Sequence, residues 1–203
     1  EAVLFFIASV SVFGQSKKIT NKDIWNFEFL AERLQEIYPL NSASQYTVLE
    51  VNRKTRVSKV VAYDYATAEF AEEIINSSVK VLIPFFTSYN FSEDENKLLL
   101  ETEAERIYRR SKRAKYYVYD RTTKKSNSLF EFKVQEPKFS PDGSKVAFVY
   151  NRNIFIKNLN TDEINQITTD GSEHIINGLS DWVYEEEFGF VRAFEWNANG
   201  TAL

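Results

Sequence analysis

The chain has 203 residues, a net charge of −4 and an isoelectric point near 5.3. Non-specific binding to nucleic acid depends on clustered Lys and Arg that release counterions from phosphates, so this charge argues against a nucleic-acid partner. The sequence contains no Cys, which excludes a disulfide framework, a thiolate metal site and a Cys nucleophile. Its aromatic content of 15% favours a β-sheet protein, because aromatic side chains pack well on pleated surfaces.

The first residues predict an export signal. Ala2 to Phe13 is an uncharged stretch that is too short to span a bilayer, which needs about 20 apolar residues. Val12 and Gly14 offer modest side chains for cleavage before Gln15. We therefore expect residues 1–14 to be a signal-peptide remnant and the protein to be exported, either periplasmic or secreted. A buried strand is the alternative interpretation.

Residues 15–45 predict a short N-terminal helix and a lead-in segment. Apolar residues recur at helical spacing, and Thr20 or Asn21 can cap the helix. The apolar residues of this expected face are Ile24, Phe27, Leu30 and Leu34.

From residue 46 onward, short apolar runs alternate with polar turns, as is typical of β-strands. The expected strands are Tyr46 to Val51, Val57 to Tyr65, Lys97 to Glu101, Tyr116 to Tyr119, Lys145 to Tyr150 and Ile154 to Ile156.

One turn motif recurs among these strands. The segment from Phe91 to Leu98 matches the segment from Phe139 to Val146, and a weaker copy begins at Trp196. Each copy joins an aromatic strand end to a polar tight turn and a second apolar strand. Repeats of roughly 40 to 50 residues built from short strands are typical of propeller blades, whereas a sandwich, the alternative, does not explain the repeated turn. We expect an all-β chain whose residues 46–203 form the first blades of a truncated β-propeller.

Three consecutive carboxylates lie between aromatic residues in the segment Asp181 to Phe188. A run of Glu is usually a solvated face. Trp182, Tyr184 and Phe188 are costly to expose, however, and predict that the segment is anchored against a core. Neighbouring carboxylates held there would repel each other unless a cation lay between them. A peptide's amino-terminal ammonium is a suitable cation, because it has three N–H donors.

Asp181 to Glu187 resembles the Asp-Trp-Val-Tyr-Glu-Glu-Glu motif of the dipeptidyl peptidase IV branch of the prolyl oligopeptidase family. The segments Leu99 to Ser111, Tyr117 to Asp120 and Phe139 to Tyr150 are similar to early-blade segments of the same family. The resemblance extends roughly from Ile19 to the end of the chain. It implies an eight-bladed propeller followed by an α/β-hydrolase domain, and that second domain is absent from these residues.

The resemblance also implies the roles of four residues. Glu186 and Glu187 correspond to the family's pair that binds the free amino terminus of the substrate, and Glu185 is left as a structural acid. Arg109 corresponds to the Arg that reaches a carbonyl of the bound dipeptide; its guanidinium offers five donors and stays charged.

Other chemistry has little support. No Gly-x-Ser-x-Gly elbow occurs, so we expect no catalytic residue in this chain. The one histidine, His174, lies in a polar stretch and has no counterpart in the family's triad, and no metal site or cofactor is expected. A nucleic-acid role for a local basic run is the weaker alternative. This run consists of Arg106, Arg109, Arg110, Lys112, Arg113 and Lys115.

The resemblance therefore implies an exported serine exopeptidase that releases Xaa-Pro or Xaa-Ala dipeptides from peptides with a free amino terminus. This segment would position the substrate, and the missing C-terminal hydrolase domain would cut it; the segment alone should be inactive. A homodimer is left open for the complete protein. Two alternatives are a non-catalytic propeller that binds peptides or proteins, since fold and function are separable, and a tripeptidyl relative.

Overall fold

The computed structural model describes residues 18–29, 36–78 and 83–203. The chain divides into two compact units, residues 1–34 and residues 35–203, which are described separately below. The expected signal segment, residues 1–14, lies outside the described residues. Within the described ranges, no helix combines the length and the apolar character that crossing a membrane requires.

The described residues of the first unit, 18–29, contain one short helix, α1 (Asn21–Trp25). Thr20 caps it, because the Thr20 hydroxyl accepts from the Asp23 backbone N–H and the Asp23 carboxylate accepts from the Thr20 N–H. The helix is shorter than its apolar spacing predicts, since Phe27 already has a left-handed φ of 58°. Leu30 and Leu34, the other residues of the expected face, lie outside the described residues.

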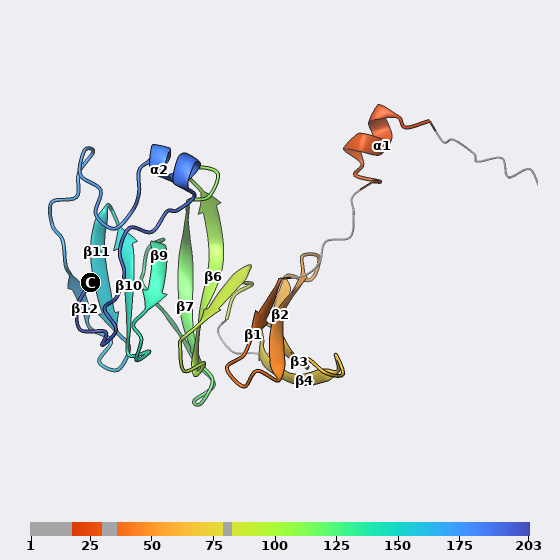
Figure 1. The fold of residues 1–203 in the computed structure, drawn as a ribbon, viewed down its shortest axis with the longest axis horizontal. Coiled ribbons are helices and arrows are strands. Elements are labelled where there is room, and N and C mark those ends of the chain that lie inside the picture. Colours follow the sequence, from red (N-terminus) through yellow and green to blue (C-terminus); the bar gives the residue numbers. More distant parts are fainter. Residues whose placement is uncertain (1–17, 30–35, 79–82) are drawn as a thin grey trace, which may run out of the picture. The chain divides into compact units, whose positions relative to one another are not determined.

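The second unit consists of three four-stranded antiparallel sheets in chain order, the pattern of successive propeller blades (Figure 1). Each sheet follows the sequential order, so every connection within it is a hairpin. The first holds β1 (Ile37–Pro39), β2 (Gln45–Asn52), β3 (Val57–Asp64) and β4 (Phe70–Asn76). The second holds β5 (Ser88–Phe91), β6 (Lys97–Arg106), β7 (Lys112–Asp120) and β8 (Lys125–Ser128). The third holds β9 (Gln135–Phe139), β10 (Lys145–Tyr150), β11 (Asn153–Asn158) and β12 (Ile164–Gln166).

The expected all-β fold of early propeller blades is confirmed, with one change at its start. The first sheet begins at Ile37, within the segment that the sequence predicted as a lead-in, because β1 pairs antiparallel with β2. A three-residue strand that ends in Pro39 gives too short a pattern to be recognised in the sequence.

The middle sheet is buried on both faces, which explains its apolar runs. Leu98 and Leu100 of β6 pack in a core shared with the first sheet, whereas Leu99 packs in a core shared with the third. Successive residues of a strand point to opposite faces, so three consecutive leucines supply both cores. Two faces buried against two neighbouring sheets are typical of a blade inside a propeller.

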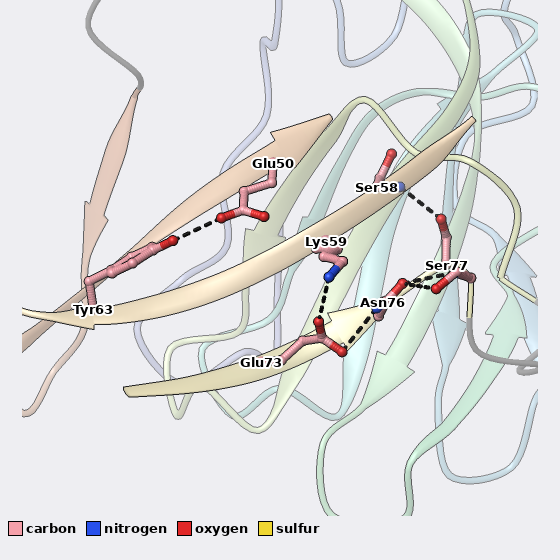
Figure 2. Close-up of polar contacts among 8 residues, drawn as sticks. Glu50, Ser58, Lys59, Tyr63, Glu73, Asn76 and Ser77 are labelled. Carbon is pink, nitrogen blue, oxygen red and sulfur yellow. Dashed lines mark hydrogen bonds and ion pairs between the residues drawn. The ribbon is translucent and has the colours of Figure 1, made fainter. Parts of the chain in front are cut away.

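Polar contacts join neighbouring strands of the first sheet (Figure 2). The Tyr63 hydroxyl donates to the Glu50 carboxylate across β2 and β3, at 2.8 Å. Between β3 and β4, Lys59 and Glu73 form an ion pair of 3.0 Å. These contacts lie away from the candidate site.

The repeated turn is present in four copies among the residues that the structure describes, one more than the sequence predicted. In each copy, the first residue's N–H donates to the carbonyl five residues later, and the residue at the fourth position has a positive φ. The copies span Leu40 to Gln45, Ser92 to Lys97, Ser140 to Lys145 and Asn197 to Ala202. The first copy carries no recognisable signal in the sequence, because Pro39 stands where the other copies have an aromatic residue.

The turns of successive sheets contact each other. The Asn41 backbone N–H donates to the Glu95 carboxylate of the next turn, at 2.6 Å. A Cβ built on Gly143 would lie 3.4 Å from the Ser92 Cβ, and one built on Gly200 would lie 3.3 Å from the Ser140 Cβ. This row of turns therefore sets the spacing of one blade against the next.

Candidate functional site

Arg109 lies at the tip of the hairpin that joins β6 to β7. The last pair of this hairpin is Arg106 with Lys112, so residues 107–111 form its tip. The tip is closed by a hydrogen bond of 2.9 Å from the Ile107 N–H to the Ser111 carbonyl. The Arg109 side chain is 72% exposed and free to meet a ligand.

The three consecutive carboxylates lie on α2 (Trp182–Phe188). Asp181 caps this helix by accepting from the Tyr184 N–H at 2.9 Å, and Gly189 ends it with a φ of 76°. In one helical turn, Glu185 is buried, Glu186 is half-buried and Glu187 is exposed.

Glu185 fastens α2 to the hairpin. Its Oε1 accepts from the backbone N–H of Arg110 at 2.6 Å and from that of Ser111 at 2.8 Å. Burial acts to raise the pKa of Glu185, but the hydrogen bonds from Ser111 and Arg110 outweigh it, so the pKa is lowered. The expected structural role of Glu185 agrees with these contacts, because they hold the tip that carries Arg109 beside α2.

These contacts bring two of the three sequence-predicted site residues together. Arg109 Nη1 lies 3.5 Å from Glu186 Oε2. Glu187, the third, lies next to them on α2, and within the described part of the chain its carboxylate forms no hydrogen bond or ion pair. An exposed guanidinium is therefore paired with a half-buried carboxylate, and the next residue of α2 carries an exposed carboxylate.

The aromatic residues of the motif do not anchor it, contrary to the sequence-based expectation. Trp182, Tyr184 and Phe188 are all at least half exposed. Among the described residues, the ring contacts of Tyr184 are within its own segment, with ring centroids 5.2 Å from Phe188 and 5.8 Å from Phe190. Polar contacts of Glu185 and of the backbone take the place of the expected apolar anchor.

The two ends of the α2 segment are joined by backbone hydrogen bonds. The Ser180 N–H donates to the Val191 carbonyl at 2.8 Å, and the Ala193 N–H donates to the Gly178 carbonyl at 3.0 Å. We call residues 178–180 and 190–193 the neck of α2. The neck packs closely on the third sheet, because a Cβ added to Gly178 would lie 2.8 Å from Val149 Cγ2.

Charged groups that the sequence analysis missed lie beneath the hairpin. Glu101 is buried, and its Oε2 accepts from the Tyr116 hydroxyl at 2.9 Å and from Lys112 Nζ at 2.6 Å. Burial, followed by the negative charge of Glu101, raises the pKa of Tyr116. Glu136 of β9 is paired with Arg192 of the neck, with 3.8 Å between Oε2 and Nη1. Nothing in the sequence marks these residues, because each lies in an ordinary strand or loop pattern.

The basic run of the hairpin is largely neutralised. Lys112 pairs with Glu101, Arg113 with Glu105 and Lys115 with Glu103. Such cross-strand pairs leave little unpaired positive charge for a phosphate backbone.

Comparisons with known proteins agree with this geometry. Residues 92–203 match the family model described as "Dipeptidyl peptidase IV (DPP IV) N-terminal region". Prolyl endopeptidase FAP of Bos taurus is 32% identical over 93% of this chain, and that of Mus musculus is 33% identical over 94%. The solved structure of Porphyromonas gingivalis dipeptidyl peptidase 4 is 36% identical over 91% of the chain, with a TM-score of 0.81. The chain spans 24% of the length of each FAP sequence and 27% of the P. gingivalis chain. With a family model that matches more than half of its residues, the chain belongs to the dipeptidyl peptidase IV family and corresponds to part of that family's N-terminal propeller region.

Proposed function

We propose that this chain is the substrate-gating propeller portion of an exported serine exopeptidase that releases Xaa-Pro or Xaa-Ala dipeptides. The observation that supports this role best is the pairing of Arg109 with Glu186, which lie 77 residues apart in sequence and are brought together by the contacts of Glu185. The curated relatives are peptidases by name, and a C-terminal hydrolase domain would complete the enzyme.

In the proposed mechanism, Glu186 and Glu187 bind the ammonium of the substrate. An ammonium can donate to both carboxylates at once through charge-assisted hydrogen bonds. Arg109, at 3.5 Å from Glu186 in the free protein, would turn its exposed guanidinium to a carbonyl of the bound dipeptide. The ammonium is thereby fixed at a set distance from the nucleophile. This distance places the bond after the second residue of the peptide at the nucleophile.

Such positioning accelerates the reaction because it holds the reacting groups in a near-attack geometry. It also rejects peptides with a blocked amino terminus. An acetylated substrate lacks the charge and two of the N–H donors, so both carboxylates would lose their solvent without gaining a partner. The serine, histidine and aspartate of the reaction, with the oxyanion hole, would be supplied by the hydrolase domain.

The test is an assay of the protein expressed from its full reading frame. A Gly-Pro chromogenic dipeptide is compared with its N-acetylated form, in the wild type and in Glu186→Gln and Glu187→Gln. Cleavage of the free amine only, lost in both variants, is the expected result. Equal cleavage of both substrates, or cleavage unaffected by both variants, would contradict the proposal.

Two further outcomes identify the alternatives. A reading frame without a Gly-x-Ser-x-Gly segment would leave a non-catalytic propeller that binds peptides. Release of tripeptides from a longer substrate would indicate a tripeptidyl enzyme with a different distance between the carboxylates and the nucleophile. Mass spectrometry of the products distinguishes the two lengths.

A second copy of the complete protein is a further proposed partner, and light scattering tests for this homodimer. Amino-terminal sequencing of the mature protein tests whether the protein is exported.

A further inference from the structure

Glu136 has a backbone conformation that its sequence position disfavours. Its φ is 50°, in the left-handed region that non-glycine residues rarely adopt. It also precedes Pro137, and the residue before a proline is normally extended. The pairing of β9 with β10 shifts register between Ala147 and Val149, opposite this position. Glu136 therefore lies in a β-bulge, a feature that can re-aim a side chain.

The re-aimed side chain reaches the neck of α2. Glu136 Oε2 lies 3.8 Å from Arg192 Nη1, and both side chains are largely buried, at 23% and 33% exposure. Arg192 lies between the two backbone hydrogen bonds that close the neck. Among the described residues, this pair is the one side-chain hydrogen bond or ion pair between β9 and the neck.

Stability does not explain this arrangement. Burial raises the pKa of Glu136. The positive charges of Arg192 and Lys112 oppose this rise, whereas the negative charges of Glu101 and Glu185 add to it. A left-handed non-glycine residue is strained as well. Desolvated ion pairs are weak sources of stability, but they can fix one arrangement of the chain. Strained backbone conformations of this type persist where the surrounding structure enforces them, and they cluster at functional sites.

We propose that Glu136 and Arg192 are a positioning pair, which fixes the neck of α2 on β9 and so places Glu186 and Glu187 beside Arg109. Glu185 holds α2 on the hairpin and this pair holds the neck on β9, so the α2 segment is tied at two points. The link to catalysis rests on the proposed function; the link to the position of α2 does not.

A matched control is available on β9 and on the residues that follow the neck. Lys138 of β9 and Glu195 form an ion pair of 2.5 Å, and the Glu195 side chain is 60% exposed. The Trp196 indole N–H also donates to the Lys138 carbonyl at 3.2 Å, so that part of the chain stays attached when the ion pair is lost. Glu195→Gln removes a carboxylate from the same neighbourhood without releasing the neck.

The experiment compares Glu136→Gln, Glu136→Gly, Glu195→Gln and the charge-swapped double variant Glu136→Arg with Arg192→Glu, all in the protein expressed from its full reading frame. For the free-amine dipeptide, we expect kcat/KM to fall about 10-fold to 100-fold in both Glu136 variants, since small misplacements of a bound substrate have effects of this size. The double variant should regain part of this loss, and Glu195→Gln should stay within about 2-fold of the wild type.

Two measurements separate positioning from stability. Glu136→Gly relieves the backbone strain, so its thermal unfolding midpoint should equal or exceed that of the wild type while its activity falls. Amide hydrogen exchange in residues 179–192 should be faster in Glu136→Gln, and exchange in β10 should be unchanged. A midpoint that falls in Glu136→Gly, or exchange in residues 179–192 that stays at the wild-type rate, would overturn the proposal. If the wild type does not cleave the dipeptide at all, the proposed function fails, and the exchange measurement still decides this inference.

Discussion

Glu185 accepts a hydrogen bond of 2.8 Å from the backbone N–H of Ser111, a residue 74 positions earlier in the chain. The same carboxylate oxygen accepts from the N–H of Arg110 at 2.6 Å. One buried side chain thus joins a helix to the tip of a hairpin. The residues on either side of these contacts, Arg109 and Glu186, are the ones that meet in the candidate site.

Replacement of Glu185 by Gln should destabilise the protein by about 2 kcal/mol, because hydrogen bonds to a charged group contribute more than neutral ones. An amide keeps one acceptor oxygen but loses the charge. The effect should also depend on pH. The pKa of Glu185 is lowered in the folded state, so its stabilising contribution is present above its unfolded value of 4.5 and is lost as the pH falls through the lower, folded value.

Urea unfolding of the wild type and Glu185→Gln at several pH values measures this difference. The control is Glu187→Gln, on the same helix but exposed, which should change stability by less than about 0.5 kcal/mol. Equal unfolding midpoints for wild type and Glu185→Gln at neutral pH would contradict the role of Glu185 as an anchor.

The fold could largely be predicted from the sequence because its signals are local. Strand alternation and the turn at Ser140 to Lys145 depend on neighbouring residues, and both are found where the sequence places them. The missed copy at Leu40 to Gln45 has the same backbone, with a φ of 56° at Ala43, but different side chains. The same backbone geometry can thus recur in a segment whose side chains differ from those of the other copies.

The site could be predicted only in part. Arg109 and Glu186 were predicted from the family resemblance, and the structure places Nη1 of Arg109 3.5 Å from Oε2 of Glu186. Glu136 and Arg192 belong to no recognisable motif. Their contact depends on the positive φ of Glu136 in a β-bulge, which cannot be inferred from a glutamate before a proline. The rings of the α2 segment were predicted to be buried, and this prediction was wrong because they are exposed. Aromatic composition alone does not tell which surface covers a ring.

Gly178 should not tolerate a side chain. Its φ is 79°, and an added Cβ would lie 2.8 Å from Val149 Cγ2 and 2.9 Å from Ile154 Cγ1. Gly178→Ala therefore combines backbone strain with overpacking against two β-branched side chains, and we expect a loss of about 2 to 4 kcal/mol. Gly189→Ala is the matched control, because its φ is 76° but the nearest side-chain atom lies at 3.7 Å. It should cost only the strain, about 1 kcal/mol. Similar losses in the two variants, measured by thermal unfolding, would show that the neck does not pack tightly on the third sheet.

Asp142 should make the repeated turn sensitive to acid. Hydrogen bonds from the hydroxyl groups of Ser140 and Ser144 and from the Ser144 N–H lower the pKa of Asp142 to about 2. A lowered folded pKa means that the stabilising contribution is present above the unfolded value of 3.8 and is lost as the pH falls toward 2. Asp142→Asn should therefore be less stable than the wild type at pH 7, and the difference should shrink as the pH is lowered from about 4 to 2. Denaturant unfolding at each pH measures the difference in the free energy of unfolding between the two proteins. A difference that stays constant over this range would show that Asp142 does not make the turn sensitive to acid.

Arg109 should matter for substrate and little for stability. Its ion pair with Glu186 is 3.5 Å long and its side chain is 72% exposed, and exposed pairs of this kind contribute at most about 1 kcal/mol. Arg109→Ala should leave the unfolding midpoint close to that of the wild type. In the complete enzyme, kcat/KM for the free-amine dipeptide should fall about 10-fold to 100-fold, the effect of a lost charged hydrogen bond. Arg109→Lys should recover only part of the loss, because a lysine presents a single charged point where the guanidinium presents a planar fork. Full activity in Arg109→Ala would mean that Arg109 does not bind the substrate and that its contact with Glu186 matters only in the absence of substrate.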